Sequence, residues 1–210
     1  MKTYFQSPFY NSFSRRGSKA LLPKVLLIGL TVTGLSLGLT GCFFGGGNET
    51  ETVDTAAEPL SVESRLENKQ TEVKITVPAN WTKADSTLRN SADIYASHAV
   101  EELYTSVLSE SADVLNQFSL EDNADKYRFL IEEELGSYEG ATKTDVTTIQ
   151  GKPAIQYEIR GQVEGVPVVY LHTTIEGEGR YYQVVGWTTA ERYAENKDTL
   201  QEIISSFEGA

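Results

Sequence analysis

The chain has 210 residues and a formal net charge of −12, and its single cysteine, Cys42, excludes an intramolecular disulfide. The charge is unevenly divided, because residues 1–41 hold five basic residues and no acid, whereas residues 42–210 hold 13 basic and 30 acidic residues. The acidic part has no basic cluster of the kind that binds phosphates, which argues against nucleic acid as a partner. Its length and its 40% of apolar residues indicate one globular domain held by a hydrophobic core.

The N-terminal residues have the layout of an export signal. A basic stretch ending at Lys24 precedes the uncharged, apolar run 25–41. The run ends in Leu39-Thr40-Gly41-Cys42, which resembles the lipobox of bacterial lipoproteins. That resemblance implies that residues 1–41 are a cleaved signal peptide and that Cys42 is the acylated first residue of the mature protein, anchored to a membrane by its lipid. The alternative is an uncleaved membrane helix, although a run of this length is at the lower limit for spanning a bilayer.

The export route and the segment after Cys42 can also be read from the sequence. Ser14-Arg15-Arg16 fits a twin-arginine signal, but Ser18-Lys19 replaces the Phe-Leu that should follow, which favours Sec export. Residues 42–70 contain three consecutive glycines and an acidic stretch without periodicity, which predicts a flexible linker.

The part of the chain after this linker begins with strand patterns. Residues 72–77 alternate apolar and polar side chains and stop at Pro78, which predicts a half-buried strand. Two more strands are expected near 92–97 and 102–110. A helix should follow, because Ser119-Leu-Glu-Asp122 is typical of a helix N-terminus and apolar residues then recur every three or four positions up to Leu135.

Four strands are expected next. Residues 142–149 turn at Gln150-Gly151 into a strand at 152–163, which ends at the hairpin signal Glu164-Gly165. The last two, 166–176 and 180–188, carry apolar side chains on both faces, which predicts central positions in a sheet covered on both sides.

A second helix closes the chain. Thr188-Thr-Ala-Glu191 resembles a capping box, and the apolar stripe after it consists of Tyr193, Leu200, Ile203, Ile204 and Phe207. Short connections favour antiparallel pairing of the strands. The sequence therefore predicts an α+β fold, an α/β/α sandwich with a mainly antiparallel sheet of about six to seven strands and helices on both faces.

Several short motifs, taken in order, resemble one superfamily. The region 71–208 is similar to the Mog1/PsbP/DcrB-like domains through Val77-Pro-Ala-Asn-Trp81, Leu103-Tyr-Thr-Ser-Val-Leu108, Gly151-Lys-Pro-Ala-Ile-Gln-Tyr157, Arg180-Tyr-Tyr-Gln-Val-Val-Gly-Trp187 and Ile203-Ile-Ser-Ser-Phe207. The resemblance implies a binding or assembly factor without a shared catalytic apparatus. PsbP-type members are extrinsic photosystem II components, and DcrB-type members are envelope lipoproteins. The first strand has Val73, Ile75 and Val77 where PsbP-type members have an aromatic stretch, which speaks against a photosystem role.

Chemistry-bearing residues are few. His98 with Glu101 and Glu102 is a weak candidate for a divalent metal site, with a solvated turn as the alternative. His172 lies in the middle of a predicted strand, which favours a structural histidine. No Ser stands in a Gly-x-Ser-x-Gly elbow, and an acylated Cys42 would not be a nucleophile. We therefore expect that the protein has no catalytic residues, binds no cofactor and is not an enzyme.

Aromatic residues are the stronger lead to function. Trp81, Tyr104, Tyr182 and Trp187 are candidates for partner contacts, with core packing as the alternative. The sequence as a whole predicts a lipid-anchored, non-enzymatic binding or assembly module on the periplasmic or thylakoid-lumenal face of a membrane, with an unidentified protein partner. The alternatives are a PsbP-like photosystem II accessory protein and a metal-dependent hydrolase that uses His98.

Overall fold

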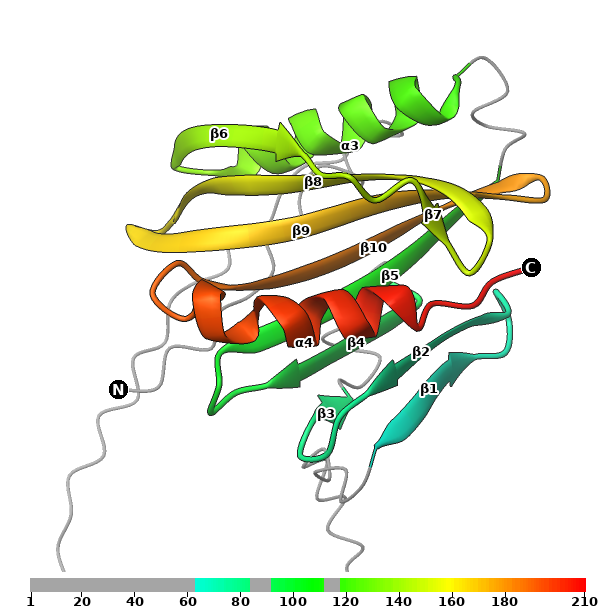
Figure 1. The fold of residues 1–210 in the computed structure, drawn as a ribbon, viewed down its shortest axis with the longest axis horizontal. Helices are drawn as coiled ribbons and strands as arrows, with labels where there is room; N and C mark the ends of the chain where they lie inside the picture. The colour runs from blue at the N-terminus through cyan, green and yellow to red at the C-terminus, as the bar shows by residue number, and fades with distance from the viewer. Residues whose placement is uncertain (1–62, 84–91, 112–117) are drawn as a thin grey trace, which may run out of the picture. The chain divides into compact units, whose positions relative to one another are not determined.

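The computed structural model describes residues 63–83, 92–111 and 118–210 (Figure 1). The predicted signal peptide, Cys42 and most of the predicted linker lie outside these residues. Within them the elements follow in this order: β1 (Ser64–Asn68), β2 (Val73–Val77), β3 (Thr82–Lys83), β4 (Ile94–His98), β5 (Leu103–Ser111), α3 (Leu120–Glu134), β6 (Ser137–Lys143), β7 (Thr148–Ile149), β8 (Lys152–Val163), β9 (Val166–Gly177), β10 (Arg180–Thr189) and α4 (Tyr193–Ser205).

The main sheet is antiparallel throughout, with the strand order β3-β4-β5-β10-β9-β8-β6. β7 extends it by pairing with β8, and β1 and β2 form a separate two-stranded sheet. β9 and β10 each have a neighbour on both sides, as their apolar pattern predicts. The predicted hairpin turn between β8 and β9 is confirmed, because Glu164 (φ 51°) and Gly165 (φ 83°) both have the positive φ of a tight two-residue turn.

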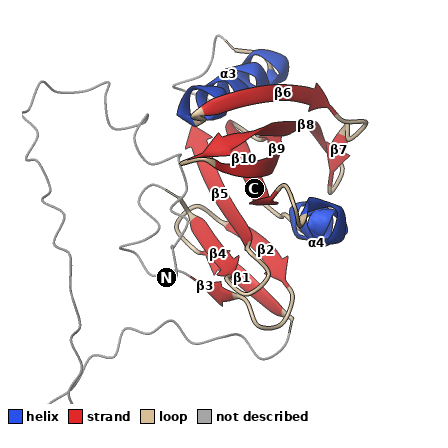
Figure 2. Cartoon of the chain, turned by 90° about the vertical axis from the view of Figure 1, so that its left-hand side faces the viewer, coloured by secondary structure: helices blue, strands red, loops and turns tan. Residues whose placement is uncertain are grey.

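The alternation of side chains along β9 divides the core into two layers. Val169 and Leu171 pack in one cluster with Ile204 of α4, and we call this side of the sheet the α4 face. Tyr170 packs in the other cluster with Ile131 of α3, on the side that we call the α3 face. Figure 2 shows the two helices on opposite sides of β8, β9 and β10. The expected sandwich, with an antiparallel sheet and helices on both faces, is confirmed.

α3 begins where the sequence predicts. Ser119 Oγ accepts a hydrogen bond from the Asp122 backbone N–H (3.1 Å), and the Asp122 carboxylate accepts one from the Ser119 N–H (3.1 Å). This capping box satisfies two backbone donors that the first turn of a helix leaves open. After the helix ends, the Gly136 N–H donates to the Gln162 carbonyl oxygen (2.8 Å), and the chain continues into β6.

The capping box expected at Thr188 is wrong. β10 extends to Thr189, so Thr188 lies inside a strand, where its Oγ1 accepts a hydrogen bond from Asn196 Nδ2 (3.1 Å). α4 instead begins after Arg192, whose side chain makes no capping hydrogen bond. The Thr188 hydroxyl, which the capping-box pattern predicted to bind the helix backbone, instead accepts a hydrogen bond from the side chain of Asn196 in α4.

The strand expected at 142–149 is divided. β6 ends at Lys143, and only Thr148 and Ile149 return to strand pairing as β7. The break comes from Thr144, whose Oγ1 accepts a hydrogen bond from the Val146 N–H (3.3 Å) and so turns the backbone locally.

The folded part also starts earlier than predicted. Residues 64–68, which the sequence placed in the linker, form β1 and pair along their whole length with β2. Leu66 is the one apolar residue of this strand and is buried. A single apolar side chain gives no alternating pattern, so the sequence of this segment does not indicate a strand. The strand forms through its pairing with β2.

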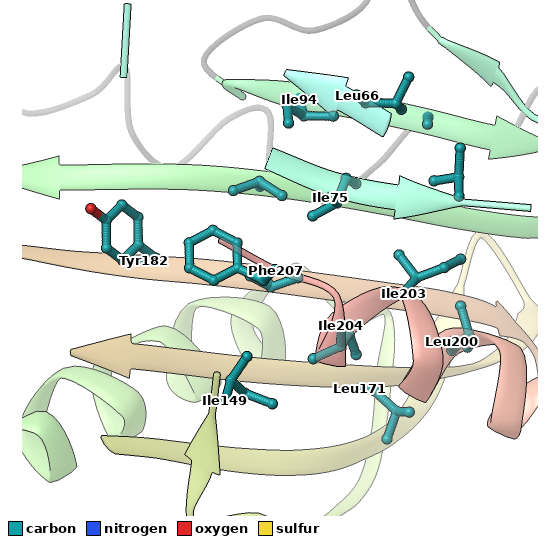
Figure 3. Close-up of a cluster of buried hydrophobic side chains, with 14 of the residues drawn as sticks. Leu66, Ile75, Ile94, Ile149, Leu171, Tyr182, Leu200, Ile203, Ile204 and Phe207 are labelled. Carbon is teal, nitrogen blue, oxygen red and sulfur yellow. The ribbon is translucent and has the colours of Figure 1, made fainter. Parts of the chain in front are cut away.

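The C-terminal residues hold β2 on the α4 face of the sheet (Figure 3). The backbone of Lys74 exchanges two hydrogen bonds with that of Glu208 (2.8 and 2.9 Å). Phe207 is fully buried with its ring centroid 5.0 Å from that of Tyr182, and the Tyr182 hydroxyl donates to the Ala210 carbonyl oxygen (2.7 Å). The first strands and the end of the chain are therefore joined in one layer.

The α3 face contains a buried polar network around His172, which is 0% exposed. His172 Nε2 lies 2.8 Å from Gln183 Oε1, and Gln183 Nε2 donates to Asn123 Oδ1 of α3 (3.1 Å). Burial lowers the pKa of His172 to about 4, against a smaller opposing effect of the Gln183 hydrogen bond. The structural role expected of this histidine is confirmed, since it links α3 to the centre of the sheet in its neutral form.

A substitution at Gly161 tests how closely the end of α3 and the start of β6 pack on β8. A Cβ at this position would lie 2.7 Å from Leu135 Cδ1 and closer still to the Ser137 carbonyl oxygen. We expect Gly161→Ala to lower the free energy of unfolding by about 1–3 kcal/mol, as overpacking typically does. Gly136→Ala is the matched control, because its Cβ would meet only an ordinary contact of 3.6 Å. Urea denaturation of both variants decides, and equal stabilities would contradict this packing.

His172 should make stability depend on pH. The folded chain holds it neutral down to about pH 4, whereas the unfolded chain binds a proton below the ordinary pKa of 6.5. The unfolded state therefore binds more protons in this window, and stability is lost as the pH falls from about 6.5 to 4, by up to about 3 kcal/mol. We expect the difference in unfolding free energy between the parent and His172→Gln to shrink over this range. Parallel pH profiles of the two proteins in urea denaturation would count against it.

Candidate functional site

The proposed metal residues lie at the end of β4, which is His98, and in the turn that follows it, which contains Glu101 and Glu102. The Glu101 backbone N–H donates to His98 Nδ1 (3.2 Å), so this ring nitrogen is used within the turn. The Glu102 carboxylate accepts a hydrogen bond from Thr189 Oγ1 (2.8 Å), and the Glu101 carboxylate binds the Arg192 guanidinium. These contacts hold the turn against the start of α4.

The three side chains do not form a set of metal ligands. In the ranges 63–83, 92–111 and 118–210, no group of three or more His, Cys, Asp or Glu side chains could hold a metal ion. Arg192 Nε also lies 3.9 Å from Glu102 Oε2, so one guanidinium lies between both carboxylates. Both carboxylates are therefore already paired with a cationic side chain.

Three of the four aromatic residues proposed for partner contacts belong to the core. Trp81 is 1% exposed, and Tyr182 and Trp187 are 0% exposed. Trp81 and Tyr182 pack in the cluster on the α4 face, whereas Trp187 packs on the α3 face. For these three residues the structure shows core packing, the alternative to partner contact, because the sheet is covered on both sides and needs large side chains in both layers.

Tyr104, the fourth, belongs to a group of aromatic rings on the α3 face that crosses four adjacent strands. Its ring stacks on Trp187 with centroids 5.4 Å apart and an interplanar angle of 14°. Tyr170 lies on the other side of Trp187 at 5.9 Å, and Tyr95 lies tilted against it at 5.9 Å. We call Tyr95, Tyr104, Trp187 and Tyr170 the aromatic row.

Strand register builds the aromatic row. Trp187 of β10 is paired directly with Tyr104 of β5 and with Tyr170 of β9. Paired residues in an antiparallel sheet point to the same face, so the three rings must lie side by side. Tyr95 joins from β4, where its neighbours Ala96 and Ser97 pair with β5. Tyr170 and Trp187 are buried, whereas Tyr95 and Tyr104 are half-buried and form the accessible end of the row.

The accessible end of the row has a negative electrostatic environment. The pKa of Tyr104 is raised, first by burial and then by the charge of Glu102. The pKa of Tyr95 is raised by burial and by the proximity of Tyr104. Both hydroxyls therefore keep their protons at neutral pH, and the row presents neutral rings beside an acidic turn.

The α4 face carries an ion cluster around Glu158 that the sequence did not indicate. Glu158 accepts hydrogen bonds from the Tyr193 hydroxyl (2.6 Å) and from Arg160 (2.7 Å). Burial raises the pKa of Glu158, but these hydrogen bonds and the charges of Arg160 and Lys197 outweigh it and hold the pKa below its ordinary value. A carboxylate held ionised in this way joins β8 to α4 and is a poor proton donor.

The half-buried rings of Tyr95 and Tyr104 leave part of the aromatic row exposed to solvent. The sequence drew attention to these aromatic residues but gave no reason to place Tyr104 and Trp187 together or to join Tyr95 and Tyr170 to them. The missing signal was the pairing of β5 with β10, two strands separated by α3, β6, β7, β8 and β9 along the chain. Within the described part of the chain, no helix is long and apolar enough to cross a membrane.

Comparison with known proteins identifies the fold. No protein-family model matches the sequence, and no curated protein matches it. Among solved structures, the cyanobacterial PsbP protein CyanoP from Synechocystis sp. PCC 6803 is similar, with a TM-score of 0.54 and 15% identity over 79% of this chain and 98% of that chain.

Two further structures show weaker likeness. One is LpqN of Mycobacterium tuberculosis, described as involved in cell envelope biogenesis, with a TM-score of 0.45 and 12% identity over 69% of this chain and 88% of that chain. The other is from Bacteroides thetaiotaomicron, with a TM-score of 0.48 and 10% identity over 72% of this chain and 49% of that chain. The sheet order, the two helices and the likeness to CyanoP together give the chain an α+β fold of the Mog1/PsbP-like type.

Proposed function

We propose that the protein is a lipid-anchored, extracytoplasmic binding module that helps to assemble or maintain a membrane protein complex. The observation that carries the proposal is the sequence Leu39-Thr40-Gly41-Cys42 at the end of an apolar run, ahead of a folded domain. Such a leader implies export and acylation of Cys42, and two or three acyl chains anchor a protein stably. The domain then works beside the membrane.

The chemistry of the described residues supports a role in binding. The side chains that the sequence put forward for metal or acid–base work have structural tasks. The Glu101 and Glu102 carboxylates bind Arg192, and His172 is buried and neutral. The aromatic row is partly accessible at Tyr95 and Tyr104, and Tyr and Trp are enriched at protein contacts. A metal-dependent hydrolase using His98 finds no support in this geometry.

A photosystem II accessory role is the second candidate, and the likeness of the fold to CyanoP favours it. The two candidates differ in where the protein is found. A photosystem accessory protein co-purifies with photosynthetic membranes and photosystem II, whereas a general envelope module is retained in membranes that contain no photosystem.

The lipid anchor can be tested at Cys42. We expect the parent to enter the detergent phase in phase partitioning, and Cys42→Ala behind a signal peptide cut by the ordinary signal peptidase to remain in the aqueous phase. The reason is that acyl chains are the anchor once residues 1–41 have been removed. Intact-mass spectrometry of the parent should show a chain that starts at Cys42 and carries added acyl mass.

The ordinary leader in front of an unchanged Cys42 is the control for the exchange of signal peptides. If the processed Cys42→Ala protein partitions into detergent as fully as the parent, the lipid is not the anchor. A parent chain whose mass still includes residues 1–41 would favour the uncleaved membrane helix instead.

A further inference from the structure

The accessible end of the aromatic row lies on a part of the α3 face that α3 does not cover. α3 packs mainly on β8 and β9 and reaches β10 through the hydrogen bond between Gln183 and Asn123. Tyr95 and Tyr104 come from β4 and β5, which lie beyond β10 in the sheet. Both rings contact the neighbouring Trp187 ring and are half-buried, so part of each stays exposed to solvent. A platform of this kind is rigid, because the side chains that support it are buried.

The negative charge of the protein determines which kind of partner can bind to such a platform. Residues 63–83, 92–111 and 118–210 contain 24 acidic and 12 basic side chains. At the end of the row next to Tyr104, Glu101 and Glu102 stand against one guanidinium, that of Arg192, which leaves one negative charge in excess. A nucleic acid, an anionic lipid surface or a second copy of this acidic chain would be repelled. A positively charged segment would be attracted.

The protein already pairs cations with aromatic rings elsewhere. Lys126 lies 5.6 Å from the ring centre of Phe118, and Arg128 lies 5.7 Å from that of Tyr157. Arg160 and Lys197 lie over Tyr193 at 5.1 and 5.6 Å. Such contacts place a cation within about 6 Å of a ring face and strengthen when water is excluded. The same geometry is open to a lysine or arginine that approaches Tyr104 from a partner.

We propose that Tyr95 and Tyr104, supported by Trp187, form the docking surface for a lysine- or arginine-rich segment of a protein partner. The proposal rests on the proposed binding function and names its surface and the chemistry of its partner. The rings supply the apolar contact area and the cation–π attraction, and the acidic turn at Glu101 and Glu102 steers the basic segment to them.

The test uses the processed full chain in nanodiscs of zwitterionic lipid. The probe is a short peptide of alternating lysine and serine, and the same peptide with glutamate in place of lysine is the charge control. Isothermal titration calorimetry should show binding of the lysine peptide and none of the glutamate peptide. We expect Tyr104→Leu and Tyr95→Leu to weaken the affinity about three- to five-fold each, the usual worth of an exposed cation–π contact. Affinity should also fall as salt is added.

Tyr138→Leu is the matched control, because Tyr138 is 39% exposed and lies on β6 at the far edge of the sheet. It should bind the lysine peptide as the parent does. Near-ultraviolet circular dichroism checks that each variant is folded. If one of the two row variants does not fold, the other still tests the proposal.

Several results would overturn the proposal. They are a parent that does not bind the lysine peptide, equal affinity of the parent and both folded row variants, an equal loss in Tyr138→Leu, and binding of the peptide to nanodiscs without protein. These outcomes are separable from a failure of the proposed function. A chain that is shown to be lipidated at Cys42 but fails the peptide test still has its anchor and has lost only this docking surface.

Discussion

Burial of both faces of β9 and β10 is the constraint on which the rest of the structure depends. Val169 and Leu171 point to one side and Val168 and Tyr170 to the other, and all four are at most 1% exposed. Two layers are therefore needed, and α4 and α3 supply them. The β1–β2 pair and the C-terminal residues complete the α4 layer, where Phe207 meets Tyr182. The polar network from Asn123 to His172 fixes α3 over the sheet.

The same arrangement creates the candidate site. Because α3 lies over β8 and β9, the far half of its face, at β5 and β4, carries aromatic residues that are only half-buried. Trp187 is fully buried, yet it supports Tyr104 by stacking against the side of its ring. A core residue thus gives a surface residue its rigidity, and the site owes its form to the register between β5 and β10. The lipid anchor proposed at Cys42 would keep this surface near membrane partners.

The sequence predicts those parts of the structure that neighbouring residues determine, and it fails where residues far apart in the chain determine them. The strand at 152–163, the turn at Glu164-Gly165 and the capping box at Ser119 follow from neighbouring residues, and the structure confirms them. The errors arise where distant groups decide. The segment around Leu66 is a strand because it pairs with β2, and the Thr188 hydroxyl accepts a hydrogen bond from the Asn196 side chain. The aromatic row depends on pairing between strands that are far apart in the chain. For Trp81 and Tyr182 the sequence left partner contact and core packing open, because aromatic content alone does not say which layer receives a side chain.

The central claim is that a membrane-tethered domain meets a basic protein segment through the aromatic row. Photo-crosslinking in intact cells tests it most directly, with a photoreactive phenylalanine analogue at position 104 or, for comparison, at position 138. We expect crosslinks from position 104 to a lysine- or arginine-rich segment of a protein, mapped by mass spectrometry, and no such product from position 138. Crosslinks from position 138 alone, or from position 104 only to lipid or to a second copy of the chain, would contradict it.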